Sequence, residues 1–350
     1  MGFVIVMLVL PTLAQEPYRG QIAYTQSIDC EIFVTCSHHI KIINLDTDES
    51  VVIDTGEPNR LWGESLSLSP DGRYISYMTN DHVFHIVDIE TTEELGVIEF
   101  FEHTNYSSYI RYKWHPTLPL IAFIYQNDYT QDFIRYQLFI FDLLKQEWYP
   151  LVEDLEFIQP YFQWSPDGTA ILFKLSNTSG YDNNSDIYLL DLTTQTHTNL
   201  THNLIRHAYP EWANDSLNIV FSTNDAIAQI VVMNTVTGNT EIIYEQEDAY
   251  IGGTEWVLDD SAILFRIDLP SSGNNVEFYL LDIVTKDVKL VLAIPPYYSG
   301  HDLSPDRTAM VYLASEEHEK DICIVSLITF EEECLEGEYA YYVSYPEWGN

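Results

Sequence analysis

Acidic side chains recur at one repeated position along the chain, directly before a Trp or Leu residue. In chain order the copies of this position are Ser67, Lys113, Gln163, Glu211, Glu255, Asp302 and Glu347. If successive copies approach one axis, their carboxylates form an arc that attracts a cation or a basic side chain. The alternative, which we favour, is that these residues cap strand ends or hydrogen-bond neighbouring structural units.

A second group of oxygen-bearing side chains suits calcium. The run Asp182-Asn183-Asn184-Ser185-Asp186 puts Asp182, Asn184 and Asp186 at alternate positions, and Ca²⁺ prefers carboxylate and amide oxygens. The run lacks the glycine and the distal glutamate of an EF-hand loop. A solvated polar loop is therefore the preferred interpretation, with calcium as the alternative and no other cofactor expected.

The four cysteines allow three disulfide connectivities. Cys323 and Cys334 flank a predicted hairpin turn near Thr329, which favours that pair, and a Cys30–Cys36 bond would then close a small loop. A metal site is the alternative, although the spacing is not that of paired CxxC knuckles.

Sequence motifs for catalysis are absent. The chain has no GxSxG elbow, no HExxH motif and no Gly-rich phosphate loop. Its 11 histidines are spread along the chain without the spacing of metal ligands. We therefore expect a protein that is not an enzyme.

Charge limits the class of partner. The 54 acidic and 15 basic residues give a formal net charge of −39, with the carboxylates scattered along the chain. Such a surface repels nucleic acid and anionic lipid and attracts basic protein or peptide surfaces. Residues 1–14 are apolar and end Thr12-Leu13-Ala14, which resembles a secretory signal. This stretch is too short to span a bilayer, so we expect a secreted or periplasmic, monomeric protein that does not span a membrane.

The elements that must position these residues form a repeat. Its turn is clearest in Leu68-Ser69-Pro70-Asp71-Gly72, Trp164-Ser165-Pro166-Asp167-Gly168 and Leu303-Ser304-Pro305-Asp306-Arg307. Pro presets φ, Asp bonds nearby backbone N–H groups and Gly accepts positive φ, so each copy predicts a tight turn between strands.

Each turn precedes an apolar strand such as Ile171-Leu172-Phe173 and then a strand ending in a polar residue, such as Leu189-Leu190-Asp191. A short fourth strand completes a four-stranded antiparallel unit. Repetition of this unit predicts an all-β chain with one β-propeller over residues 15–350, of about seven blades, six or eight being the alternatives.

Both chain ends are expected to close the ring. Tyr345-Pro346-Glu347-Trp348 repeats Tyr209-Pro210-Glu211-Trp212, an innermost strand, and Gly20-Gln21-Ile22-Ala23-Tyr24 resembles the strand that follows it. Pairing the two completes a composite blade and hides exposed strand edges. An alternative register makes residues 22–26 the innermost strand and residues 31–37 the next.

The Trp-Ser-Pro-Asp-Gly turn, the Ile-x-Phe strand and the polar hairpin resemble the TolB-type, WD-like propeller repeats of exported bacterial proteins. The resemblance implies a scaffold that binds a protein or peptide at the disc face or central channel. Two alternatives remain open. One is an accessory propeller of a prolyl-oligopeptidase-like hydrolase without its catalytic domain, and the other is a metal-dependent carbohydrate-binding or lyase propeller.

Overall fold

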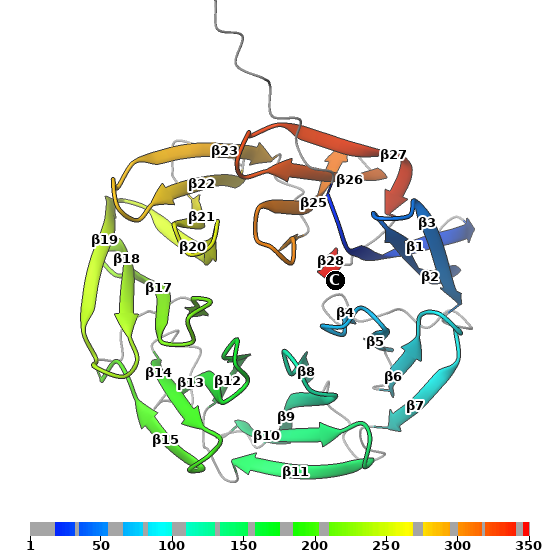
Figure 1. Ribbon diagram of the computed structural model, residues 1–350, viewed down its shortest axis with the longest axis horizontal. Helices are drawn as coiled ribbons and strands as arrows, with labels where there is room; N and C mark the ends of the chain where they lie inside the picture. The colour runs from blue at the N-terminus through cyan, green and yellow to red at the C-terminus, as the bar shows by residue number, and fades with distance from the viewer. Residues whose placement is uncertain are drawn as a thin grey trace, which may run out of the picture.

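A computed structural model describes most of the chain as β-strands arranged around one axis (Figure 1). The strands of the described residues form seven four-stranded antiparallel sheets, and no helix occurs among them. The predicted all-β propeller of about seven blades is therefore confirmed. The residues that the structure describes are 18–31, 35–54, 66–79, 83–99, 110–129, 134–152, 158–175, 185–202, 210–268, 276–294, 300–316, 319–340 and 346–349. The predicted signal segment, residues 1–14, lies outside them.

Each sheet is one blade, and its strands are counted outward from the axis. For blades 1 to 7, the first strands are β28 (Glu347–Gly349), β4 (Ser67–Leu68), β8 (Ile110–Trp114), β12 (Ile158–Trp164), β16 (Glu211–Trp212), β20 (Tyr250–Val257) and β24 (His301–Leu303). The second strands are β1 (Gln21–Glu31), β5 (Tyr74–Met78), β9 (Leu120–Tyr129), β13 (Ala170–Leu175), β17 (Asn218–Asn224), β21 (Ala262–Asp268) and β25 (Ala309–Glu316).

The outer half of each blade follows the same order. The third strands are β2 (Thr35–Asn44), β6 (Val83–Asp88), β10 (Ile134–Asp142), β14 (Asp186–Asp191), β18 (Ile227–Asn234), β22 (Val276–Asp282) and β26 (Glu319–Ser326). The fourth strands are β3 (Glu49–Asp54), β7 (Glu94–Glu99), β11 (Glu147–Val152), β15 (Thr196–Asn199), β19 (Thr240–Glu247), β23 (Val288–Ile294) and β27 (Glu332–Ala340).

The turn between the first and second strands is held by the side chains that the repeat predicts. In blade 4, Ser165 Oγ donates to Asp167 Oδ1 at 2.6 Å and accepts from the Ala170 N–H at 2.9 Å. Asp167 Oδ1 also accepts from the Thr169 N–H at 3.0 Å. Gly168 has φ +72°, a backbone conformation that favours glycine. Asp and Gly act as predicted, and Ser adds a second cap.

The turn between the third and fourth strands also depends on one polar residue. Asp191 Oδ1 accepts from the N–H groups of Thr193 and Thr194 at 2.8 and 2.9 Å. The backbone hydrogen bond from Thr194 is the largest effect that lowers the pKa of Asp191. Asp142 and Asp282 cap their turns with the same geometry. The polar residue that ends each third strand therefore fixes the hairpin.

The hydrophobic core lies between blades. Seven clusters of buried residues each combine side chains from two consecutive blades, and the seventh joins blade 7 to blade 1. Between blades 3 and 4, for example, Ala122 and Ile140 pack with Trp164 and Phe173. Burying such apolar surface is the main stabilising term, so the ring is held by contacts that close on themselves.

The two chain ends close the ring within blade 1. Strand β28 pairs with β1 through Ile22 and Trp348, and the Trp348 indole N–H donates to the Arg19 carbonyl at 2.8 Å. The composite blade with β28 innermost is confirmed. The alternative register is wrong, because residues 22–26 belong to the second strand and pair outward with β2.

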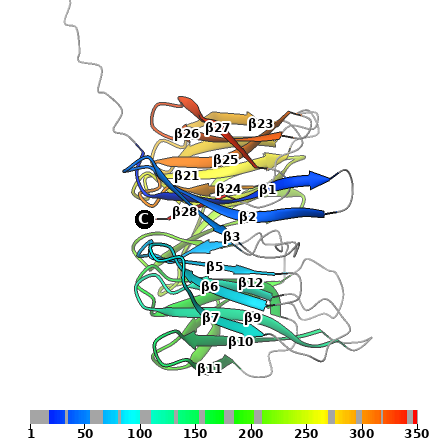
Figure 2. The same cartoon turned by 90° about the vertical axis from the view of Figure 1, so that its right-hand side faces the viewer.

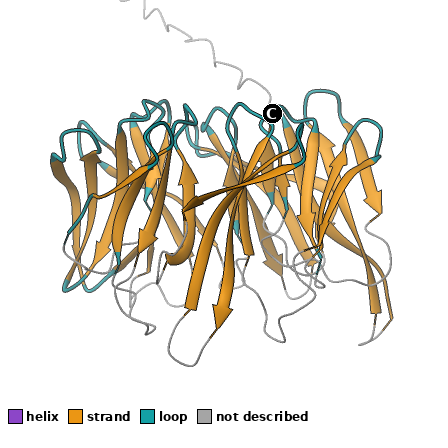
Figure 3. Cartoon of the chain, turned by 90° about the horizontal axis from the view of Figure 1, so that it is seen from below, coloured by secondary structure: helices purple, strands orange, loops and turns teal. Residues whose placement is uncertain are grey.

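Alternating strand directions put both kinds of turn on one face of the disc, here called the turn face. Figure 3 shows these turns in teal along one side, and Figure 2 shows the strands running between the two faces. Innermost strands run toward the turn face, so residues near their ends lie close to it. Within the described part of the chain, no helix has the length and apolar character needed to cross a membrane.

Candidate functional site

The seven repeated positions named above, here called the axial residues, lie on the innermost strands. The Trp that follows an axial residue is buried between blades, at 1% exposure for Trp212 and 4% for Trp256. Successive side chains of a strand point to opposite sides, so Glu211 and Glu255 point away from the blade gap that their neighbouring Trp fills. Lys113 is exposed, and the other axial residues are partly buried. The fold thus brings side chains from all seven blades toward one axis.

Several axial residues bond to the neighbouring blade. The Gln163 side-chain amide donates to the Glu211 carboxylate, and the Tyr161 hydroxyl donates to the Pro210 carbonyl. Glu255 Oε1 lies 2.7 Å from His301 Nε2. These contacts connect blades 4 and 5 and blades 6 and 7, so part of the acidic arc has the blade-to-blade bonding that the sequence favoured.

Asp302 bonds across the ring closure. Its Oδ2 accepts from the Trp348 N–H of blade 1 at 2.7 Å, and its Oδ1 accepts from the Leu303 N–H at 2.9 Å. Burial raises the pKa of Asp302 to about 6, the Trp348 hydrogen bond opposes this shift, and the Glu255 charge adds to it. Burial followed by the Asp302 charge raises the pKa of Glu347 well above its usual range.

The other two acidic axial residues differ from each other. Burial raises the pKa of Glu211, against the opposing charge of Lys113. For Glu255, burial also acts to raise the pKa, but the His301 charge and hydrogen bond and the Arg307 charge outweigh it and leave the pKa lowered. The Lys113 charge acts to lower the pKa of Glu211, Glu255 and Glu347, so one basic side chain acts on carboxyl groups of three different blades.

Sequence reasoning missed four residues of this site. Arg307 replaces the turn glycine at φ +55° and donates from Nη1 to the Trp256 carbonyl at 3.1 Å and toward the Trp212 carbonyl at 3.5 Å. His301 directly precedes Asp302, and Arg111 and Tyr161 stand two residues before Lys113 and Gln163. Residues two apart on a strand point to the same side, so Arg111 and Tyr161 could have been found from the axial residues Lys113 and Gln163. The Arg307 side chain contacts two other blades, and no sequence pattern indicates these contacts.

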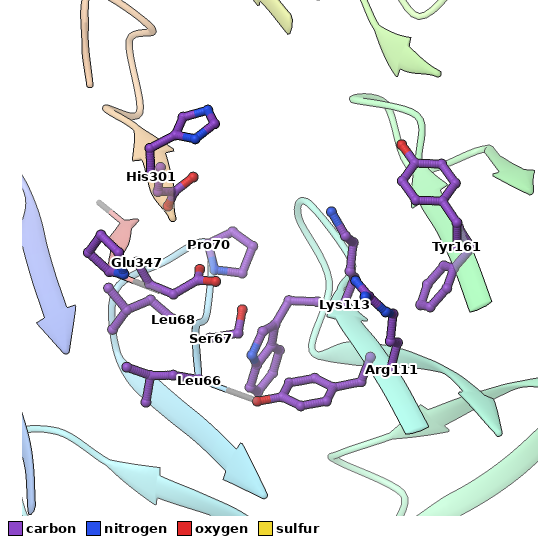
Figure 4. A pocket seen from close by; sticks show the side chains of 14 residues that line it. Leu66, Ser67, Leu68, Pro70, Arg111, Lys113, Tyr161, His301 and Glu347 are labelled. Carbon is purple, nitrogen blue, oxygen red and sulfur yellow. The ribbon is translucent and has the colours of Figure 1, made fainter. Parts of the chain in front are cut away.

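A cavity of about 580 Å³ opens among the innermost strands of blades 1, 2, 3, 4 and 7 (Figure 4). Its lining includes the axial residues Ser67, Lys113, Asp302 and Glu347. Arg111 and Lys113 come from β8, while Glu347 and Asp302 come from β28 and β24. Cavities of about 300–1,000 Å³ are the usual size of small-ligand sites. We call this space the axial cavity.

The predicted calcium ligands are described only in part. Asp182 and Asn184 lie outside the described residues. The Asp186 carboxylate accepts hydrogen bonds from Asn199 Nδ2 at 2.8 Å and Thr201 Oγ1 at 2.9 Å, within blade 4. Calcium binding at this run therefore stays a prediction.

The predicted Cys323–Cys334 disulfide is present and joins β26 to β27 directly across the hairpin. Cys30 and Cys36 lie on β1 and β2, but their side chains are outside the described ones. Among the described residues, the one group with the spacing of metal ligands is Cys323, Glu332 and Cys334. Both of its cysteines are in the disulfide.

No protein-family model matches the chain. No curated protein matches it either. Many solved structures are similar to this chain. TolB from Acinetobacter baumannii is 16% identical, with a TM-score of 0.54 over 93% of this chain and 82% of TolB. A structure from a study of two prolyl endopeptidases is 13% identical, with a TM-score of 0.67 over 93% of this chain and 50% of the enzyme.

Oligogalacturonate lyase from Vibrio parahaemolyticus is 14% identical, with a TM-score of 0.63 over 80% of each chain. Identities this low establish the fold and leave the activity open. The structure and these likenesses together show that the chain has a seven-bladed β-propeller fold, which it shares with TolB.

Proposed function

We propose that this protein is an exported, monomeric, non-enzymatic propeller that binds a basic protein or peptide segment at the ring axis. The observation that carries the proposal is the set of four carboxyl groups from consecutive blades, Glu211, Glu255, Asp302 and Glu347. They stand on the innermost strands of blades 5, 6, 7 and 1, and carboxyl groups gathered around one axis favour a cationic ligand.

The charge of the whole chain supports the same partner. With a net charge of −39, the protein attracts basic surfaces over distances of about 10 Å at moderate salt. At a distance, a basic segment is attracted only weakly, because salt screens the charges. Once it reaches the axis, it contacts partly buried carboxyl groups directly. Its binding should therefore weaken with salt, but less steeply than binding to the exposed outer strands.

Two enzymes share the fold, but that likeness does not carry their activities. Neither the prolyl-endopeptidase role nor the oligogalacturonate-lyase role is supported by a particular observation among the described residues. A purified sample that turned over a peptide or polysaccharide panel, and lost that turnover when Glu211 or Glu255 was changed to Gln, would contradict the non-enzymatic proposal.

Capture of partners from the native exported fraction tests the binding proposal. The bait is the full chain, compared with a channel variant that combines Glu211→Gln, Glu255→Gln and Glu347→Gln. The matched control removes three exposed charges from β19 by Glu241→Gln, Glu245→Gln and Glu247→Gln. We expect one or more basic proteins to bind the wild-type and control baits at least ten times more than the channel variant. Equal capture by all three baits would overturn the proposal.

A further inference from the structure

The axial cavity lies to one side of the ring axis. Its lining comes from blades 7, 1, 2, 3 and 4, while Arg307 extends over the first strands of blades 5 and 6 through the carbonyls of Trp212 and Trp256. Glu211 and Glu255 have protein partners on that side, in Gln163 and His301. The cavity therefore lies beside these pairs, and His301 also belongs to its lining.

Opposite walls of the cavity carry groups of opposite kind, basic side chains on one and carboxyl groups on the other. Arg111 and Lys113 extend from β8, and they are two of only 15 basic residues in a chain of net charge −39. Glu347 of blade 1 lies across the cavity from them (Figure 4), and Asp302 of blade 7 also belongs to the lining. Blade 2 lies between the two walls in the ring and contributes Leu66, Leu68 and Pro70 to the lining.

One group on each wall has no direct partner within the described part of the chain. Lys113 forms no ion pair or side-chain hydrogen bond with another described residue, and the Glu347 carboxylate accepts no hydrogen bond from one. The Lys113 charge acts to lower the pKa of Glu347, but the two side chains form no ion pair. A ligand can supply the missing partner of such a group: an anion suits Lys113, and a cation, which would act to lower the raised pKa of Glu347, suits its carboxyl group.

We propose that the axial cavity binds a dipolar chain end, namely a C-terminal Lys or Arg residue with a free carboxylate. The carboxylate faces Lys113 and Arg111, and the cationic side chain extends along blade 2 to Glu347. This inference rests on the proposed function, because it names the part of the partner that enters the axis.

The shape of the lining distinguishes this ligand from a free amino acid. An α-ammonium and an α-carboxylate are attached to the same carbon, so the two charges of a free amino acid with an uncharged side chain stay close together. A Lys or Arg side chain places its charge several bonds away from the carboxylate. Its methylene stem packs on Leu66, Leu68 and Pro70 while the charged head reaches the far wall. Arg111 and Lys113 both attract a carboxylate, and a guanidinium can bind one through two parallel hydrogen bonds.

Calorimetric titration of the full chain with four N-acetylated tripeptides tests the inference. The peptides end in Gly-Lys or Gly-norleucine, each as the free acid and as the amide. We expect the Lys free acid to bind at least ten times more tightly than either singly altered peptide. Lys113→Gln should abolish the preference for the free acid and keep the preference for Lys over norleucine. Glu347→Gln should do the reverse, and Glu247→Gln on β19 should change neither.

Failure of the chain-end inference can be distinguished from failure of the proposed function. Equal binding of Lys free acid and Lys amide, or of an internal basic segment with both ends blocked, would overturn the chain-end inference and leave the proposed function standing. Absence of binding by all four tripeptides would also overturn the inference. The proposed function would then be decided by capture from the exported fraction with the channel variant.

Discussion

The substitution Asp302→Asn should stabilise the protein at alkaline pH and lose that effect in acid. The folded chain holds the Asp302 pKa at about 6, against an ordinary value of 3.8. A carboxyl whose pKa is raised on folding binds its proton more tightly in the folded state. Stability is therefore lost as pH rises from 3.8 to 6, and the loss is complete above that window.

The size of the effect follows from the shift. About two pH units at about 1.4 kcal/mol each amount to about 3 kcal/mol of destabilisation above pH 6. Asparagine removes this term but keeps only one oxygen for the two N–H groups of Leu303 and Trp348, which costs about 1 kcal/mol. We expect Asp302→Asn to raise the free energy of unfolding by about 2 kcal/mol at pH 8 and by about zero at pH 4.5.

Urea unfolding at several pH values between 4.5 and 8 measures this difference. Asp225→Asn removes a charge from an exposed turn and is the matched control for the net charge of the chain. An Asp302→Asn effect that is the same at every pH, or a destabilisation at pH 8, would refute the electrostatic reasoning. An equal pH-dependent gain in the control would show that the overall charge, rather than the Asp302 site, is responsible.

Three further substitutions test the architecture by urea unfolding. Trp348→Ala should lower the free energy of unfolding by about 3–5 kcal/mol, because it empties the packing between blades 7 and 1; a loss under 1 kcal/mol would contradict closure by the C-terminal strand. Gly168→Ala should lower the free energy of unfolding by about 1–3 kcal/mol, because φ is +72° and the added Cβ would collide with the His115 ring. Gly96→Ala is the control: it has open space at the Cβ position and should lower the free energy of unfolding by less. Replacing both Cys323 and Cys334 by Ser should cost about 3 kcal/mol for a sequence separation of 11, and unchanged stability would show that the bond adds nothing to the fold.

The fold could be predicted from the sequence because its determinants are local. Each Ser-Pro-Asp-Gly turn is held by side chains within five residues, as Ser165 and Asp167 show. The polar residue at the end of each third strand likewise caps its own hairpin. Counting the copies of these local turns predicts the number of blades. The incomplete units at the two chain ends predict that they pair to close the ring.

The site could be predicted only where it follows the repeat. Glu211, Glu255, Asp302 and Glu347 occupy equivalent positions, so the period finds them. The unequal behaviour of their carboxyl groups depends on partners from other blades, such as His301 for Glu255 and Gln163 for Glu211. The axial cavity depends on the volumes of side chains from several blades, so its position cannot be predicted from any local sequence pattern.

The register of blade 1 shows the same limit. Residues 22–26 have the composition of an innermost strand and of a second strand alike. The buried Trp348 and its hydrogen bond to the Arg19 carbonyl decide between the two. That contact joins residues 329 positions apart, so only the closed ring reveals it.

Titration of the full chain with a doubly blocked basic peptide distinguishes binding at the ring axis from binding to the outer acidic surface. The peptide carries internal Lys residues, and its matched probe replaces each Lys by norleucine. We predict that wild type and the β19 control bind the Lys peptide at least ten times more tightly than the channel variant does, with little binding of the norleucine probe. Equal affinity of all three proteins for the Lys peptide would place binding on the general acidic surface and contradict a functional ring axis.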